Sequence, residues 1–292
     1  MGNQARIEKK LFPYLIAAPA VIFLGFLVIY PLIKGILLSF FSVKFAESGM
    51  FVGLKNYIRL FRDANFWHSL KITMIYSVVS VAGTFCLGLL MALLINVEFR
   101  GRTIVRAILA LPWAISDIAV AIMWNWIFDY QFGALNYLLR VLHIINEPVQ
   151  WLLNPNIALW SVLMAYIWKS FPLSMLILLS GLQAIPKEQY EAATVDGAGK
   201  IQSFWYVTLP GLKPTASILL LLSIVWSFRS FALTWALTQG GPIKATETIA
   251  IAVYKNAFMY FDMSYASTLG VIGLILSLIV SFFYFRMERK QD

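Results

Sequence analysis

"EAATVDGAGKIQSFWYVTLP", from Glu191 to Pro210, is a polar segment between two long apolar runs of a chain of 292 residues. Its glycines and proline predict a helix over residues 187–195, a turn at Gly197 and Gly199, and a second short helix that ends near Pro210. Two patterns of exposure follow from the helical period. The first helix would expose Lys187, Glu188 and Glu191, and the second would bury Ile201, Phe204 and Trp205.

The apolar runs on either side of this segment belong to a membrane composition. The chain is 60% hydrophobic and 13% charged, whereas soluble domains have about 25% charged residues. A helix needs about 20 mostly apolar residues to cross a bilayer. Six runs reach that length, at about 11–33, 72–95, 104–128, 157–182, 212–236 and 267–285. We therefore predict an all-α membrane protein with a single transmembrane domain over residues 1–292.

Basic residues indicate how these spans are oriented. Arg6, Lys9 and Lys10 precede the first run, and Ala-Pro-Ala at 18–20 resembles a signal-peptide cleavage site. The run continues to Tyr30, long enough to span, so we expect an uncleaved first helix with a cytoplasmic N-terminus. Six spans return the C-terminus to the cytoplasm, and lysines and arginines are more frequent in the segments on that side. This distribution explains the net charge of +9 without a nucleic-acid partner.

The loop after the first run contains an amphipathic segment, FVGLKNYIRLFRD, at residues 51–63. Helical spacing places Phe51, Leu54, Ile58 and Phe61 near one face. An interfacial helix along the outer leaflet would have this pattern. A small lid packed on the helix bundle would have it equally well.

Three charged residues, Asp117, Lys169 and Arg229, fall inside the predicted spans, where a charge costs about 2.5–3.5 kcal/mol on insertion scales. Each is close in sequence to aromatic residues. A sugar-binding cavity would use both features, because sugar rings stack on aromatic side chains while hydroxyl groups need polar partners. The alternative is a structural ion pair between Asp117 and either Lys169 or Arg229.

Three short motifs of the polar segment, EAA, DGA and LP, resemble the signature loop of permease subunits of binding-protein-dependent, ATP-driven bacterial importers. FRGRTIVRAILALPWAIS at 99–116 and LTQGGP at 237–242 are similar to the carbohydrate branch, the maltose or glycerol-phosphate type. The resemblance implies a six-helix type I ABC importer permease fold in which residues 185–211 form a coupling loop seated on a separate ATPase. The implied coupling residues are Glu191, Ala192, Ala193, Asp196, Gly197, Ala198, Leu209 and Pro210.

The resemblance also implies a substrate pathway through the third, fourth and fifth spans. The matching positions are Trp113, Asp117, Tyr166, Lys169, Ser170, Leu173, Trp226, Ser227 and Ser230, and Arg229 adjoins them. Their residue types differ from the maltose pattern, so we expect a different sugar. Lys169 and Arg229 would complement an anionic or highly hydroxylated substrate, such as a uronate oligosaccharide or a phosphorylated polyol.

The partners implied by the resemblance are a second permease, in a heterodimer, and two copies of a cytoplasmic ATPase that binds ATP and Mg. An external solute-binding protein would deliver the carbohydrate to a complex in the cytoplasmic membrane of a bacterium or archaeon. The chain contains no G-x-x-x-x-G-K-[ST] phosphate loop, so we expect neither ATP hydrolysis by this subunit nor a cofactor or metal of its own.

Two rival functions stay open from the sequence. An ion-coupled secondary transporter would use Asp117 as a proton or sodium site and would need no ATPase. A membrane enzyme would need a cluster of acid, base or nucleophile residues, and the sequence offers no such cluster.

Overall fold

The structure is a computed structural model that describes residues 16–43 and 49–288. Contacts group the chain into two compact units. Unit 1 comprises residues 1–63 and 253–272, and unit 2 comprises residues 64–252 and 273–292. The predicted start of the first span at Leu11 and both chain termini lie outside the described residues. A single domain over the whole chain stays a prediction.

Within the described residues, five helices are long and apolar enough to cross a membrane, and a bent helix pair makes a sixth span if it is counted as one. The all-α membrane class is therefore confirmed, with the expected number of spans on that count. The five helices are Ile16–Leu38, Ala64–Asn96, Ala158–Ala184, Lys200–Arg229 and Met263–Phe282.

Unit 1 contains the first of these helices, a short hairpin and the beginning of the last helix. Its two-residue strands pair antiparallel, with Phe41 opposite Phe51. Its elements are the π-helical segment η1 (Gly25–Ile29), α2 (Tyr30–Leu38), β1 (Phe41–Ser42), β2 (Met50–Phe51), α3 (Lys55–Arg62), the π-helical segment η3 (Lys255–Met259) and the start of α14 (Met263–Glu288).

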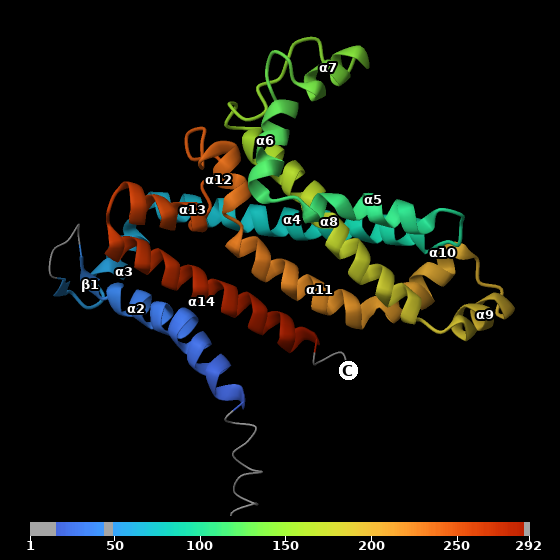
Figure 1. The fold of residues 1–292 in the computed structure, drawn as a ribbon, viewed down its shortest axis with the longest axis horizontal. Coiled ribbons are helices and arrows are strands. Elements are labelled where there is room, and N and C mark those ends of the chain that lie inside the picture. The colour runs from blue at the N-terminus through green and yellow to red at the C-terminus, as the bar shows by residue number, and fades with distance from the viewer. Residues whose placement is uncertain (1–15, 44–48, 289–292) are drawn as a thin grey trace, which may run out of the picture. The chain divides into compact units, whose positions relative to one another are not determined.

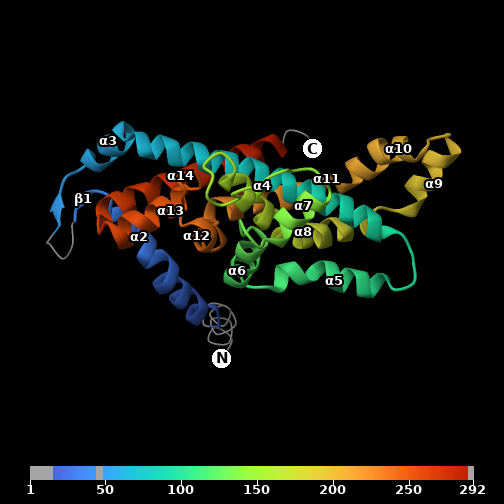
Figure 2. The ribbon, with the colours of Figure 1, turned by 90° about the horizontal axis from the view of Figure 1, so that it is seen from above.

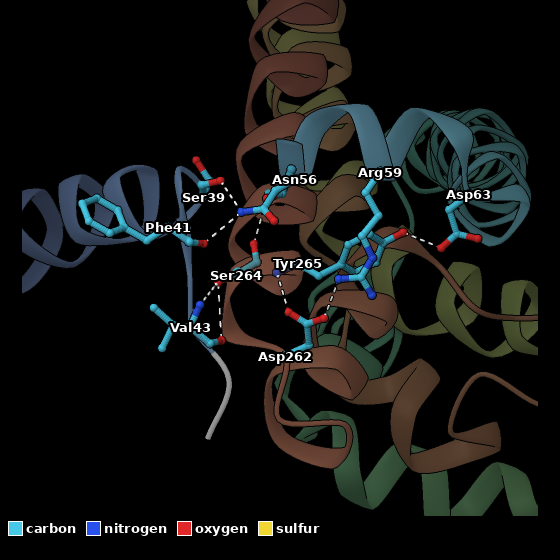
Figure 3. A network of polar contacts seen from close by, with 10 residues as sticks. Ser39, Phe41, Val43, Asn56, Arg59, Asp63, Asp262, Ser264 and Tyr265 are labelled. Atoms are coloured by element: carbon cyan, nitrogen blue, oxygen red, sulfur yellow. Dashed lines mark hydrogen bonds and ion pairs between the residues drawn. The ribbon is translucent and has the colours of Figure 1, made fainter. Parts of the chain in front are cut away.

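A polar network inside unit 1 joins α3 to the start of α14 (Figure 3). The Arg59 guanidinium forms an ion pair with Asp262 at 2.7 Å and lies 4.6 Å from the centre of the Tyr265 ring. The Tyr265 hydroxyl donates to the Asp63 carboxylate at 2.6 Å. These contacts hold the C-terminal end of α3 against the start of α14.

Residues 55–62 of the amphipathic segment form α3, whereas Phe51, which was predicted on the same helical face, lies in β2. The buried residues of α3 are Asn56 and Leu60, and the Asn56 amide donates to the carbonyl oxygens of Ser39 and Phe41 at 2.8 and 2.9 Å. The predicted apolar face remains exposed, as an interfacial helix requires. The exposed residues are Phe51, Leu54, Ile58 and Phe61.

Unit 2 is a helical bundle in which α4 (Ala64–Asn96) and α8 (Ala158–Ala184) pack on each other most extensively. Gly88 lets them approach, because a Cβ atom there would lie 2.7 Å from the Ser174 Cβ. Gly181 does the same between α8 and α11, where a Cβ atom would lie 2.7 Å from the Thr215 hydroxyl. Small residues at such positions give membrane helices their close packing.

Several of the remaining helices of unit 2 lie at its two ends. Figures 1 and 2 place α9 and α10 at one end of the unit, away from α6, α7 and α12. In chain order, the remaining elements are α5 (Arg102–Ala114), α6 (Asp117–Ile127), α7 (Ala134–Val141), α9 (Lys187–Val195), α10 (Lys200–Ser203), the π-helical segment η2 (Phe204–Thr208), α11 (Leu209–Arg229), α12 (Ala232–Thr238) and α13 (Ile249–Tyr254). The last two residues of α13 belong to unit 1.

The predicted third span, 104–128, is not one straight helix. It forms α5 and α6, which meet at an angle of 96°. Ile115 and Ser116 between them are extended, and the Ser116 hydroxyl caps α6 by accepting a hydrogen bond from the Ala119 amide at 3.3 Å. A new helix therefore begins at Asp117, and its first turn lies at the bend between α5 and α6.

The predicted fifth span, 212–236, is wrong at both ends. Its helix begins at Lys200 and runs through Pro210 without a break: Pro210 has no N–H to donate, and the π-helical segment η2, with its wider i→i+5 hydrogen bonding, lies directly before it. It ends at Arg229, since Ser230 is extended, and α12 then begins at Ala232.

Candidate functional site

The bend between α5 and α6 places a carboxylate inside unit 2. Asp117 is the first residue of α6, where the positive end of the helix dipole stabilises a negative charge. Lys169, in the middle of α8, reaches it: the Lys169 Nζ lies 2.7 Å from the Asp117 Oδ1. The Lys169 side chain is 16% exposed and the Asp117 side chain 42% exposed, so the lysine is the more enclosed partner of this ion pair.

The third predicted membrane charge, Arg229, is the last residue of α11, where the negative end of the helix dipole favours a cation. Arg229 is exposed. No acidic side chain of the described residues pairs with it.

These charges line one cavity of about 530 Å³, a size typical of small-ligand sites. Its wall comes from α4, the α5–α6 bend, α8, and the break between α11 and α12. Nine of the ten predicted pathway residues line it. They are Trp113, Asp117, Tyr166, Lys169, Ser170, Leu173, Trp226, Arg229 and Ser230.

Ser227, the tenth, does not line the cavity. It is 3% exposed, and its hydroxyl lies 2.5 Å from the Ser77 hydroxyl of α4. Ser230 of the same helix end bonds the Tyr76 hydroxyl of α4 at 2.8 Å but still reaches the cavity. Ser227 therefore holds α11 against α4 and does not line this cavity.

The contribution of α4 to the cavity was not predicted from the sequence. Ser80 and Thr84 lie four residues apart on that helix and face the cavity together. That spacing of hydroxyl residues in an apolar run was the available signal. The other lining residues that were not predicted are Val81, Ser174, Ser223, Phe231 and Ala232.

The cavity combines aromatic surface with hydroxyl groups and a formal excess of one positive charge, from two cations and one carboxylate. Trp113 is 51% exposed and Trp226 is 38% exposed, so both indole rings present surface for stacking. Such a lining suits a ligand with apolar ring faces, several hydroxyl groups and a negative charge.

A second feature is the polar segment, which we call the elbow segment (residues 187–210). Helix α9 covers Lys187–Val195, as predicted, and Lys187, Glu188 and Glu191 are exposed. The turn after it has Gly197 at φ +80°, a left-handed conformation that favours glycine. A Cβ atom at Gly197 would meet nothing within 4 Å, so only the backbone conformation demands glycine there.

The second half of the elbow segment differs from the prediction. Ile201 and Trp205, expected to be buried, are 76% and 60% exposed, and Tyr206 is 80% exposed. The Tyr190 hydroxyl of α9 lies 3.1 Å from the Thr208 hydroxyl, which ties the two halves together. The segment therefore projects from the bundle as a braced element with apolar residues on its surface.

The eight predicted coupling residues all lie on this element. Ala193, Ala198 and Leu209 are partly buried, and the other five are exposed: Glu191, Ala192, Asp196, Gly197 and Pro210.

Comparison with known proteins finds one family over most of the chain. Residues 84–292 match the family described as binding-protein-dependent transport system inner membrane component. The chain is 35% identical to the sulfoquinovosyl glycerol transport system permease protein SmoG of Agrobacterium fabrum, over 98% of this chain and 93% of that protein. It is also 35% identical to the trehalose/maltose transport system permease protein MalF of Thermococcus litoralis, over 91% and 94%.

Solved structures share the fold at lower identity. A chain of a bacterial ABC transporter involved in the import of the acidic polysaccharide alginate matches with a TM-score of 0.83 and 23% identity, over 99% of both chains. A chain of a bacterial alginate ABC transporter in complex with an alginate pentasaccharide-bound periplasmic protein matches with a TM-score of 0.86 and 23% identity, over 98% of this chain and 96% of that chain.

Proposed function

The chain belongs to the family of binding-protein-dependent transport system inner membrane components, and from this premise we propose that it is the sugar-conducting permease subunit of an ATP-driven importer. It has the type I ABC importer permease fold. The observation that carries the proposal is the cavity of about 530 Å³, which gathers nine of ten predicted pathway residues around Asp117, Lys169 and Arg229.

The proposed substrate is a carbohydrate with an acidic group. Two relatives at 35% identity are named as transporters of sulfoquinovosyl glycerol and of trehalose and maltose, which supports the sugar class. Within the cavity, Trp113 and Trp226 would stack on sugar rings. Arg229 would bind the acidic group, because Lys169 already has Asp117 as its partner.

The proposed energy source is a separate ATPase subunit, since the chain has no phosphate loop. The exposed apolar residues of the elbow segment and the acids Glu191 and Asp196 would seat in that ATPase. Nucleotide-driven closure of two ATPase copies would move the elbow segment, and α8 and α11, which flank it in sequence, would reshape the cavity between two access states. A second permease would complete the pathway, and an external binding protein would deliver the sugar.

In this arrangement the elbow segment and both termini face the cytoplasm. Helix α8 runs from Ala158 to Ala184, a rise of about 40 Å at 1.5 Å per residue, so its first turn would lie on the outer side of the membrane. The loops that precede α8 would then face the binding protein.

Affinity purification of the intact complex through a tag on this chain tests the proposal. We expect an ATPase subunit and a second permease to co-purify, and calorimetry on the complex's binding protein to rank an acidic oligosaccharide above its neutral analogue. A complex that holds this chain alone and imports sugar on an ion gradient would instead support the secondary transporter, with Asp117 as the ion site.

A further inference from the structure

Unit 2 has a second cavity, of about 470 Å³, at the far ends of α6 and α12. Residues 128–130, 150–153 and 239–242 close its sides. Figure 1 shows α6 and α12 next to each other at the end of unit 2 that lies away from α9 and α10. Leu153 of the cavity wall comes shortly before α8 begins, and the elbow segment follows the end of the same helix. The cavity and the elbow segment thus lie at opposite ends of α8.

Packed side chains separate this outer cavity from the central one. Both cavities adjoin α6 and α12, the central cavity at the start of each helix and the outer cavity at the end. Between them the two helices contact each other through a buried cluster that includes Trp124, Leu233 and Leu237. From Asp117 to Phe128 the rise along α6 is about 16 Å. The outer cavity is therefore a distinct compartment, not an extension of the central site.

The lining of the outer cavity includes four polar side chains with hydrogen-bonding capacity to spare. Within the described residues, the side-chain amides of Gln150 and Gln239 have no hydrogen-bond partner, and the Asn125 side chain makes only a long contact, 3.5 Å to the Ala236 carbonyl. One oxygen of Asp129 accepts from the backbone amides of residues 131 and 132 at 2.9 and 2.7 Å, which fixes the carboxylate. Its second oxygen has no protein partner within the described residues.

Three aromatic side chains, Phe128, Tyr130 and Trp151, also line this cavity. Trp151 is held in place, because its indole nitrogen donates to the Asn136 side chain at 2.9 Å and its ring packs 6.0 Å from the Phe128 ring. Tyr130 is 42% exposed beside it. A fixed aromatic wall with unused amide and carboxylate groups is the chemistry that binds a hydroxylated sugar.

The charge of the outer cavity is opposite to that of the central one. Asp129 is its one charged lining residue, whereas the central cavity has a formal excess of one positive charge. A carboxylate accepts hydrogen bonds from sugar hydroxyl groups and disfavours a second carboxylate nearby. The outer lining therefore suits a neutral sugar unit.

We propose that the cavity lined by Asn125, Asp129, Tyr130, Gln150, Trp151 and Gln239 is an outer saccharide subsite, which holds a neutral sugar unit before α6 and α12 part to admit it to the central cavity. This inference rests on the proposed function, since it takes the substrate to be a carbohydrate and the elbow segment to be cytoplasmic. It adds a loading site that is separate from the central one.

The experiment is cysteine protection in the intact complex, in lipid nanodiscs that leave both sides accessible. Cys86 is the one cysteine of the chain, so a Cys86→Ala background gives a clean start. Gln150→Cys reports on the outer cavity, Ser170→Cys on the central one, and Gln131→Cys is the matched control, exposed and outside both linings. A charged methanethiosulfonate reagent labels each variant with maltopentaose, with alginate pentasaccharide, or with no sugar.

Maltopentaose should slow the labelling of Gln150→Cys about tenfold at a concentration that occupies the site nine-tenths of the time. Alginate pentasaccharide should protect it less, and Gln131→Cys should be labelled at one rate throughout. Protection of Ser170→Cys alone would overturn the outer subsite and leave the proposed function standing.

Two further outcomes would also overturn the inference. If the empty binding protein protects Gln150→Cys as well as the sugar does, the cavity is a seat for that protein. If neither sugar protects either reporter, the carbohydrate assignment itself fails, and the outer subsite fails with it.

Discussion

The ion pair between Asp117 and Lys169 decides how the central cavity is charged. The sequence left two roles open for these residues, lining a cavity or pairing with each other, and the structure shows both at once. Pairing neutralises Asp117 without removing it from the cavity wall, so Arg229 provides the net charge. Under the proposed function, Arg229 would discriminate between acidic and neutral sugars, and the pair would mainly fix α6 relative to α8.

Lys169→Met should cost little stability and much transport. The carboxylate is 42% exposed, so loss of the pair should lower the free energy of unfolding of the complex by only about 1 kcal/mol. The unpaired Asp117 would repel an acidic sugar and lower its uptake rate about tenfold or more. Uptake assays and thermal unfolding measure the two effects. An unchanged rate and substrate preference would refute a substrate role for Lys169.

Arg229→Gln should discriminate between substrates. A charge-assisted hydrogen bond contributes about 1.5–3 kcal/mol, so affinity for an acidic sugar should fall about 10- to 100-fold, while a neutral sugar of equal length is little affected. Arg229→Lys is the matched control, because it keeps the charge. Competition between labelled acidic and neutral sugars gives the ratio directly, and equal losses for both would contradict the assignment.

Nine of the residues that line the central cavity were expected, the three charges from the sequence itself and most of the others only through the resemblance to carbohydrate permeases. Membrane charges and flanking aromatic residues mark a polar site, because burying them in lipid is costly. Serine and threonine hydroxyl groups give a weaker signal, since they can bond carbonyl oxygens of their own helix, as Ser80 and Ser227 do. The resemblance placed Ser227 in the pathway, although its hydroxyl bonds Ser77, and Ser80 and Thr84 of α4 were missed.

At the scale of elements, hydropathy located the apolar spans but did not show where the chain bends within one of them. The apolar run at 104–128 is continuous, yet the chain turns by 96° within it. The cause is local: Ser116 caps a new helix at Asp117, a start signal that an average over apolar residues hides. Helix α9 was predicted with its observed bounds, because proline and glycine mark both of its ends.

Gly197→Ala should weaken the elbow segment where Gly199→Ala does not. Gly197 has φ +80°, which costs a residue with a side chain about 1–2 kcal/mol. Gly199 has φ −72°, which alanine adopts without strain. The amount of ATPase that co-purifies with Gly197→Ala should be lower than with the native chain, and the amount that co-purifies with Gly199→Ala should be unchanged. Equal recovery would mean that the turn conformation does not matter for coupling.

Gly88→Ile should separate α4 from α8. Its added side chain would collide with Ser174 and the backbone of Met175, at a cost of about 1–3 kcal/mol. Gly270→Ile is the control, because a Cβ atom there meets nothing within 4 Å. Thermal unfolding of the purified complex should show a lower midpoint for the first variant alone. A shift of the same size in both would indicate that helix propensity, not packing, is responsible.

At the scale of the whole molecule, the chain has the parts of a transporter that binds and conducts, and the proposal assigns the source of work to another subunit. The central cavity and the elbow segment lie within one compact unit, residues 64–252 and 273–292, joined by α8 and α11. Movement imposed on the elbow segment therefore reaches the cavity through two continuous helices.

Sugar uptake into proteoliposomes tests the proposed function most directly. ATP is supplied on the side of the membrane that carries the ATPase, and ionophores collapse all ion gradients. The complex with the native chain should import sugar under these conditions, and Glu191→Arg combined with Gly197→Trp should abolish both import and ATPase assembly. Import that continues with the double variant, or that needs an ion gradient and no ATP, would contradict it.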